Sequence, residues 1–248
     1  MISSSGILTG EERNIESKTG SLFAIEVLTG RVLWRGITLG EAWWFNSDRV
    51  TNDTLFVQTF RKPDLPEPKG IIAIDLHTGN IRWHQPDFSI LGTTLNRVLV
   101  MRQGFTHREY CALDAMTGEI VQDFGVEQPI FPEGDELPDT FFADPIQEIP
   151  IALRSAIKVE DIRGPIDVLR HGFYEIYGLH RIGDHPDTKL LMNELIIFKK
   201  GRLVFRETIQ AETPLPLPEN FFVSHNILLY VKEKRTLVGV DLRHDART

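Results

Sequence analysis

The chain has 248 residues, of which 42% are hydrophobic and 25% charged, so it can bury a substantial core as soluble globular proteins do. Its formal net charge of −8 excludes the broad basic face that binding to nucleic acids or anionic membranes requires. The single cysteine, Cys111, excludes an internal disulfide, and its apolar surroundings predict a buried thiol rather than a nucleophile.

The N-terminal residues carry no recognisable targeting signal. Residues 1–6 do not combine a basic segment with a following apolar stretch. No run approaches the ~18 apolar residues of a membrane span. We therefore expect a cytoplasmic protein without membrane insertion, although a chain whose leader had been removed would look the same.

The sequence contains an internal repeat. Three copies share the pattern A-[IL]-[DE]-x-x-T-G: AIEVLTGRVLW at 24–34, AIDLHTGNIRW at 73–83 and ALDAMTGEIVQ at 112–122. A weaker copy, LIIFKKGRLVF, spans 195–205, and a truncated copy, LVGVDL, covers 237–242. The glycines of the first three copies are 49 and 39 residues apart. Strand-like repeats at about this spacing predict the blades of a β-propeller.

Each complete copy predicts a β-hairpin. An apolar strand precedes an acidic residue that can accept backbone N–H bonds across a tight turn, and the glycine supplies a positive φ. The next strand ends in tryptophan in the first two copies, and we expect both rings to be buried between neighbouring sheets. The structural residues predicted in this way are Glu26, Gly30, Trp34, Asp75, Gly79, Trp83, Asp114 and Gly118.

The copy AIDLHTGNIRW resembles the repeat of pyrroloquinoline-quinone enzymes and their non-enzymatic relatives, which include bacterial outer-membrane assembly propellers. The sequence EAWW at 41–44 and the later FFV…LLYVK also resemble an uncharacterised family of bacterial propeller-like proteins of about this length. The resemblance implies the blade. It implies no particular activity, because the second family has no known function.

Further strands are expected in the intervals between the copies. One should precede each copy, at Gly6–Glu12, Thr54–Phe60, Arg97–Arg102, Phe173–His180 and Ile227–Val231. Inner strands are expected at Ala42–Asn46, Ser89–Thr94 and Asn220–Ser224. We therefore predict an all-β propeller of antiparallel blades, with either five units and a long insertion or six units of which one is degenerate.

Residues 125–170 interrupt the repeat pattern. They are rich in proline and acidic residues, which predicts an insertion or a degenerate blade with short strands. We expect almost no helix outside 133–165. We predict that 1–248 is a single domain, closed by pairing of the N- and C-terminal segments, because closure removes open sheet edges.

The candidate ligand-binding residues are Glu41, Trp43, Trp44 and His107. Adjacent strand residues face opposite sides, so one of the two tryptophans can pack in the core while the other faces an axial funnel. The alternative is that both rings pack between blades. Residues 180–187, HRIGDHPD, contain metal-ligand side chains, but a polar hairpin loop is the favoured interpretation, and we predict no metal site.

Two classes of function remain open. The first is a non-enzymatic binding or protein-interaction propeller, whose partner is another protein or a small ligand in the axial funnel. The second is an enzyme of the hydrolase or lyase type with its active site in that funnel. The quinone enzymes use adjacent cysteines, an acidic base and calcium, as the resemblance implies. One cysteine cannot supply that pair, so we predict no cofactor and no quinone-dependent dehydrogenase activity.

Overall fold

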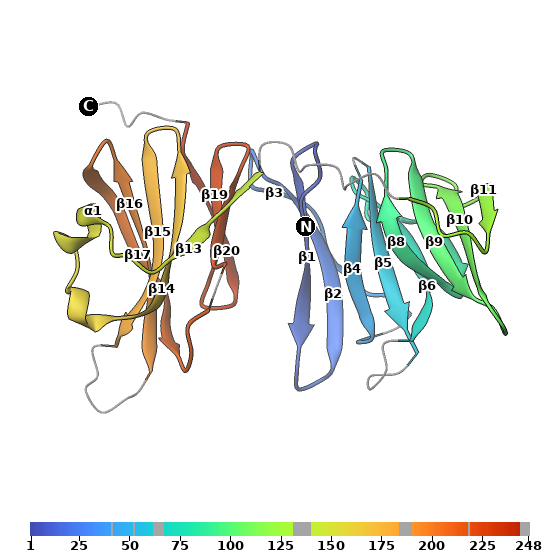
Figure 1. The fold of residues 1–248 in the computed structure, drawn as a ribbon, viewed down its shortest axis with the longest axis horizontal. Coiled ribbons are helices and arrows are strands. Elements are labelled where there is room, and N and C mark those ends of the chain that lie inside the picture. The colour runs from blue at the N-terminus through green and yellow to red at the C-terminus, as the bar shows by residue number, and fades with distance from the viewer. Residues whose placement is uncertain are drawn as a thin grey trace. The chain divides into compact units, whose positions relative to one another are not determined.

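Strands account for almost all of the regular structure of this protein. The computed structural model describes residues 1–40, 42–51, 53–61, 67–130, 140–183, 190–217 and 219–243. Within these ranges, strands form five antiparallel sheets, and helix is limited to α1 (Ile151–Arg154) and the 3-10 turn η1 (Val159–Asp161) (Figure 1). The predicted all-β class is therefore confirmed, and both helical segments lie within the predicted range 133–165.

The chain divides into two compact units, Met1–Pro138 and Asp139–Thr248. The first unit contains three sheets whose strands follow one another in chain order. Sheet 1 consists of β1 (Ile7–Asn14), β2 (Thr19–Glu26) and β3 (Arg31–Ile37). Sheet 2 consists of β4 (Phe45–Val50), β5 (Thr54–Phe60), β6 (Pro68–Asp75) and β7 (Ile81–Pro86). Sheet 3 consists of β8 (Phe88–Thr93), β9 (Arg97–Gln103), β10 (Arg108–Asp114) and β11 (Ile120–Gly125).

The second unit contains the other two sheets. Sheet 4 consists of β13 (Asp144–Ile146), β14 (Ile162–His171), β15 (Tyr174–Ile182), β16 (Leu191–Lys199) and β17 (Arg202–Thr213). Sheet 5 consists of β12 (Thr140–Phe142), β18 (Phe221–Ser224), β19 (Ile227–Lys232) and β20 (Thr236–Asp241). Two short strands from the proline-rich region, β12 and β13, thus join different sheets. Residues 131–139 of that region lie outside the described residues.

The hydrophobic core lies between successive sheets within each unit. Leu22 and Ala24 of sheet 1 pack with Leu55 and Val57 of sheet 2, and a second cluster joins sheets 2 and 3. In the second unit, one cluster joins sheets 4 and 5, and another places Leu153 of α1 against the opposite face of sheet 4. Alternation along the strands therefore buries both faces of the sheets that have a neighbour on either side.

The predicted pairing of the N- and C-terminal segments does not occur among the described strands. β1 pairs with β2, and β20 pairs with β19. The physical reason is locality, because a short hairpin turn brings each terminal strand to its neighbour at little cost in chain entropy. The single-domain organisation and the propeller arrangement of the sheets stay predictions.

The three complete repeat copies form turns of the same geometry. Gly30, Gly79 and Gly118 have φ of +69°, +75° and +74°. In each turn, the glycine N–H donates to the carbonyl of the acidic residue four positions earlier, at 2.8–2.9 Å. Asp75 and Asp114 each accept two backbone N–H bonds through Oδ1, at 2.8–2.9 Å. The longer Glu26 instead accepts the hydroxyl of Thr29, at 2.5 Å.

The tryptophans of the first two copies lie on the turn of the copy that follows. Trp34 is 8% exposed and Trp83 is 9% exposed. The Trp34 indole N–H donates to the Leu76 carbonyl at 2.7 Å, and a Cβ added at Gly79 would lie 2.9 Å from the ring. Trp83 repeats this arrangement on the next turn, with a 3.1 Å bond to the Ala115 carbonyl and the ring against Gly118. Each indole thus joins one sheet to the next.

Substitution of Gly79 by valine should destabilise the fold more than substitution of Gly30. Both glycines have a similar positive φ, so both changes carry a backbone strain of about 1–3 kcal/mol. Only the Gly79→Val side chain would also collide with Trp34 and Ile37, because no described atom lies within 4 Å of the Cβ position at Gly30. The measurement is the free energy of unfolding in urea, and equal losses in the two variants would contradict the docked indole.

Removal of the Trp83 ring should lower the free energy of unfolding by about 3–5 kcal/mol, as for other large-to-small core substitutions. The matched control is Ile81→Ala on the same strand. Ile81 is exposed, so this change should stay within about 0.5 kcal/mol. A loss for Trp83→Ala no larger than that of the control would show that the ring is not a core element.

Candidate functional site

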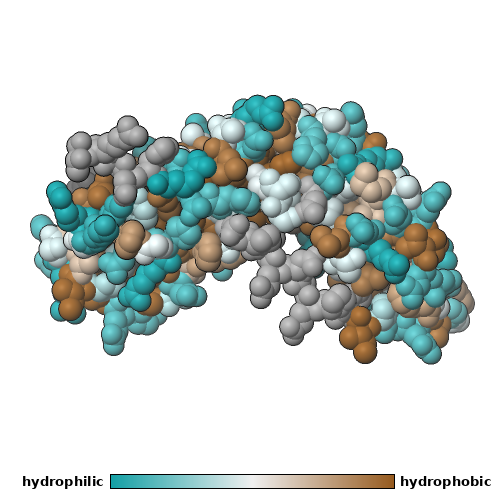
Figure 2. Space-filling view, turned by 90° about the horizontal axis from the view of Figure 1, so that it is seen from above, coloured by the Kyte–Doolittle hydropathy of each residue, from teal (hydrophilic) through white to brown (hydrophobic). Residues whose placement is uncertain are grey.

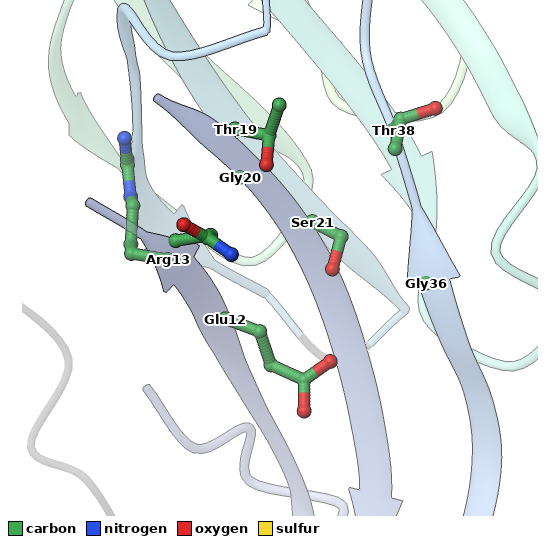
Figure 3. Close-up of a pocket in the computed structure, with 8 residues that line it drawn as sticks. Glu12, Arg13, Thr19, Gly20, Ser21, Gly36 and Thr38 are labelled. Carbon is green, nitrogen blue, oxygen red and sulfur yellow. The ribbon is translucent and has the colours of Figure 1, made fainter. Parts of the chain in front are cut away.

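A groove lies at the end of sheet 1, where the hairpin between β1 and β2 meets the end of β3. Leu22 and Ala24 of β2 point into the core with sheet 2, so the alternate residue Ser21 points to the other face. The groove has a volume of about 360 Å³. The residues that line it, several of them drawn in Figure 3, are Glu12, Arg13, Asn14, Thr19, Gly20, Ser21, Gly36 and Thr38.

Hydroxyl groups and paired charges define the chemistry of this groove. Glu12 and Ser21 are directly opposite each other on β1 and β2 (Figure 3). The Glu12 carboxylate accepts Arg35 at 2.5 Å, so its charge is already compensated. Thr19 and Thr38 add hydroxyls that can both donate and accept hydrogen bonds. The groove can therefore recognise a polar, uncharged group.

Arg13, one of the lining residues, holds sheet 1 to the beginning of sheet 2. Its guanidinium donates to the Trp43 carbonyl at 2.5 Å and to the Phe45 carbonyl, and it lies over both aromatic rings. Glu11 accepts Arg13 at 2.6 Å and also accepts the Ser47 backbone N–H at 2.6 Å. These bonds use the guanidinium to connect two sheets, so Arg13 is a structural part of the site.

The four predicted ligand-binding residues lie in different places. Trp43 and Trp44 precede β4 and are half-buried. The Trp43 carbonyl is held by Arg13, and the Trp44 carbonyl accepts the Phe60 N–H at 2.9 Å. His107 is exposed in the turn between β9 and β10 of sheet 3, within 3.6 Å of Glu109. Glu41 lies outside the described residues.

Trp43, Trp44 and His107 are not among the residues that line the groove on sheet 1. Its own lining residues carry no motif, because serine, threonine and glycine are common in strands and turns. The ligand-binding role of Glu41, Trp43, Trp44 and His107 stays a prediction. Trp43 comes nearest to the groove, through the guanidinium of Arg13 that contacts it.

The segment 180–187 was interpreted as a polar hairpin loop, but its first residue, His180, belongs to a buried polar cluster on β15, and residues 184–187 lie outside the described residues. His180 is 3% exposed, and its register partner on β16, Asn193, is 1% exposed. His180 Nε2 accepts the Leu217 N–H at 3.0 Å, and Asp167 accepts a backbone bond at Glu219. Burial lowers the pKa of His180 and raises the pKa of Asp167. Both side chains thereby anchor the loop between β17 and β18.

A second group on sheet 4 combines a buried carboxylate with two arginines. The Glu194 side chain is 4% exposed and lies 3.0 Å from Arg181 and 2.9 Å from Arg206. A buried carboxylate needs such partners because desolvation of an unpaired charge is costly. The three residues come from β15, β16 and β17, so their approach depends on strand register that the sequence does not reveal.

Two other residues from the sequence analysis, Cys111 and Asp75, lie in environments that serve the fold. The Cys111 thiol is buried with Phe88 and Val98, and burial raises its pKa, as expected for an unreactive thiol. Despite the opposing effect of burial, hydrogen bonds from Arg82 and Thr78 lower the pKa of Asp75 to about 2.

In the described ranges, no group of three or more His, Cys, Asp or Glu side chains could hold a metal ion. No described helix has the length and apolar character to cross a membrane.

Comparison with known proteins finds a match to one family model over part of the chain. A family model described as "Domain of unknown function (DUF4905)" matches residues 2–83, which contain sheet 1 and most of sheet 2. No curated protein matches the sequence.

Among solved structures, similarity extends over most of the chain at low identity. The Pyrococcus horikoshii acylaminoacyl peptidase is 12% identical, with a TM-score of 0.31, over 95% of this chain and 37% of that chain. Kluyveromyces lactis Hsv2 is 9% identical, with a TM-score of 0.29, over 99% of this chain and 74% of that one. Kuenenia stuttgartiensis hydrazine synthase is 11% identical, with a TM-score of 0.29, over 95% and 80%. The chain thus spans well under half of the first of these structures.

The bond between His180 and Leu217 should make stability depend on pH. Because the folded-state pKa of His180 is lowered, the unfolded chain binds more protons below about pH 6.5. The stabilisation is complete above that pH and is lost as the pH falls. We expect the free energy of unfolding to decrease from about pH 7 to about pH 5.5, by at most about 1.4 kcal/mol per pH unit for one proton.

The variant His180→Gln tests this assignment, because a glutamine oxygen can still accept the Leu217 N–H but does not titrate. Its pH profile should be flatter than that of the wild type over this range. The control is His107→Gln, which changes an exposed histidine and should leave the slope unchanged. A slope retained in His180→Gln would contradict the assignment.

Proposed function

We propose that this chain is a non-enzymatic binding module that recognises a polar peptide segment of another protein in the groove on sheet 1. The observation that supports this function is the combination of hydroxyl groups and compensated charges in an open groove. Thr19, Ser21 and Thr38 offer donors and acceptors, while Glu12 is paired with Arg35. A peptide backbone presents alternating N–H and C=O groups, which match such a lining.

The polar character of the surface is in keeping with recognition through hydrogen bonds. On the face shown in Figure 2, hydrophilic residues are interspersed with hydrophobic ones. Interfaces that form and dissociate are about as apolar as the rest of a protein surface, so such a mixed surface suits a transient partner.

The positions of the titrating groups favour binding over catalysis. An enzyme needs an acid or base whose pKa is adjusted and which faces the substrate. Among the groups whose pKa is shifted, Asp75, Asp167 and His180 lie outside the groove. Each is also bonded to the backbone or side chains of its own unit, so each serves the fold.

We also propose that the five sheets are the blades of a propeller. The two docked tryptophans support this arrangement, because each joins one sheet to the next by the same contact. A series of identical contacts between successive sheets generates a regular rotation, as in other repeat architectures.

The groove can be tested with peptides. A displayed library of random peptides of about twelve residues, selected against the full chain, should yield binders. Their addition should shift the backbone amide resonances of Glu12, Ser21 and Thr38 in nuclear magnetic resonance spectra. Ser21→Arg places a long side chain in the groove and should weaken binding at least about tenfold, since lost polar contacts and steric conflict both oppose the complex.

The matched control is Thr106→Arg, which adds the same side chain to an exposed turn of sheet 3. It should bind the selected peptides as the wild type does. Failure to select any binder, or selected peptides that bind Ser21→Arg unchanged, would contradict the proposed function.

A further inference from the structure

The docked tryptophans define a binding seat, which consists of a turn glycine and the carbonyl of the residue that follows the acidic position. In the second copy this seat is Gly79 with the Leu76 carbonyl, and Trp34 occupies it. In the third copy it is Gly118 with the Ala115 carbonyl, and Trp83 occupies it. Both glycines are buried under the ring. The molecule therefore contains two filled examples of one aromatic site.

The first copy has the same backbone arrangement. The Val27 N–H donates to the Gly6 carbonyl at 2.9 Å, as Leu76 donates to Asp53 and Ala115 donates to Asn96, both at 3.0 Å. The Val27 carbonyl corresponds by its place in the repeat to the Leu76 and Ala115 carbonyls, which accept the indoles in the other two copies.

The turn of the first copy reproduces the threonine bond of the filled seats, although Glu26 does not accept the two backbone N–H bonds that Asp75 and Asp114 accept. The Thr29 hydroxyl accepts the Arg31 N–H at 3.2 Å. The equivalent threonines in the second and third copies accept the N–H two residues later at 3.3 Å. Gly30 keeps the positive φ that the seat requires. The first copy therefore shares with the filled seats the positive-φ glycine, the threonine bond and the backbone bond of the residue after the acidic position.

The seat of the first copy differs in that no described residue of the first unit fills it. No described atom lies within 4 Å of a Cβ added at Gly30. Gly30 is exposed, in contrast to its two counterparts, and the neighbouring Leu28 is 45% exposed. The open space is thus the position that an indole ring fills in the second and third copies.

The fourth copy has a similar glycine turn but lacks the other parts of the seat. Gly201 also has a positive φ and open space at its Cβ position. The acidic position there is Ile197, and lysine replaces threonine before the glycine. The bonds that shape the other turns are therefore missing, which makes this turn a natural control.

We propose that the Gly30 turn with the Val27 carbonyl is a docking site for a tryptophan on an extended segment of a partner protein. The occupant follows from the filled seats, in which the aromatic residue is tryptophan and comes from a β-strand, β3 or β7. The indole combines a flat apolar ring, which covers glycine, with one N–H donor for the carbonyl. This site is separate from the groove, whose lining does not include the turn.

The probe is the peptide of residues 78–86, TGNIRWHQP, which is the strand that fills the third seat. Added to the full chain, it should shift the amide resonances of Gly30, Val27 and Leu28 in a saturable manner, with the ring-current effect of an indole. The same peptide with Trp83→Ala should bind at least about tenfold more weakly, because it lacks both the ring and the donor.

The variant Gly30→Asn closes the seat with a side chain that tolerates positive φ. It should lose the response to the peptide while its thermal unfolding stays close to that of the wild type. Gly201→Asn makes the same change at the control turn and should keep the response. Binding at this turn is measured by the amide resonance of Gly30, whereas binding in the groove is measured by that of Ser21. The two kinds of binding can therefore be distinguished.

Three results would overturn the proposal. The first is an equal response to the tryptophan and alanine peptides. The second is a response that survives in Gly30→Asn. The third is a Gly30 resonance that already shows a ring-current shift in the free chain and does not respond to the peptide, since this would show that the chain itself covers the seat.

Discussion

An indole ring seated on the glycine turn of the following repeat is the contact on which the order of the first three sheets depends. The contact needs a positive φ, the absence of a Cβ, a carbonyl free to accept the indole N–H and an acidic residue that fixes the turn. Gly79, Leu76 and Asp75 supply these for Trp34. Each requirement is local, but the contact joins different sheets, so the hairpin and the packing between sheets stabilise each other.

The turn chemistry of the repeats could be predicted from the sequence, since acid, threonine and glycine act within a few residues of one another. The expected strands at Thr54–Phe60 and Ile227–Val231 also occur, within one residue of β5 and β19. The alternation of apolar residues is a direct consequence of strand geometry. The direction of the docking, from each tryptophan to the next copy, does not follow from the pattern and required the structure.

The groups of the candidate sites could not be predicted because they meet through strand register. Glu194 meets Arg181 and Arg206 across three strands, and His180 meets the backbone of Leu217 in a loop 37 residues away. The dipeptide Trp43-Trp44 led to a functional hypothesis, and in the structure the guanidinium of Arg13 donates to the Trp43 carbonyl and lies over the Trp43 ring. An unusual dipeptide thus indicates an unusual environment without indicating its role.

The two tryptophan contacts that join sheets 1, 2 and 3 form a row with two unlike ends, and solvation explains the difference. The first position in this row of contacts is the turn at Gly30, which no described residue of the first unit fills. The last is the tryptophan position of the third copy, which is Gln122 and is exposed on β11. An exposed indole would leave a large apolar surface in water, which is unfavourable and promotes association. An open seat leaves only a glycine and a carbonyl, both of which water solvates readily. An unfilled glycine turn at one end of the row of contacts is therefore tolerated in water, whereas an exposed indole at the other end would not be. The unfilled turn at Gly30 is the end that can accept an aromatic side chain from a partner.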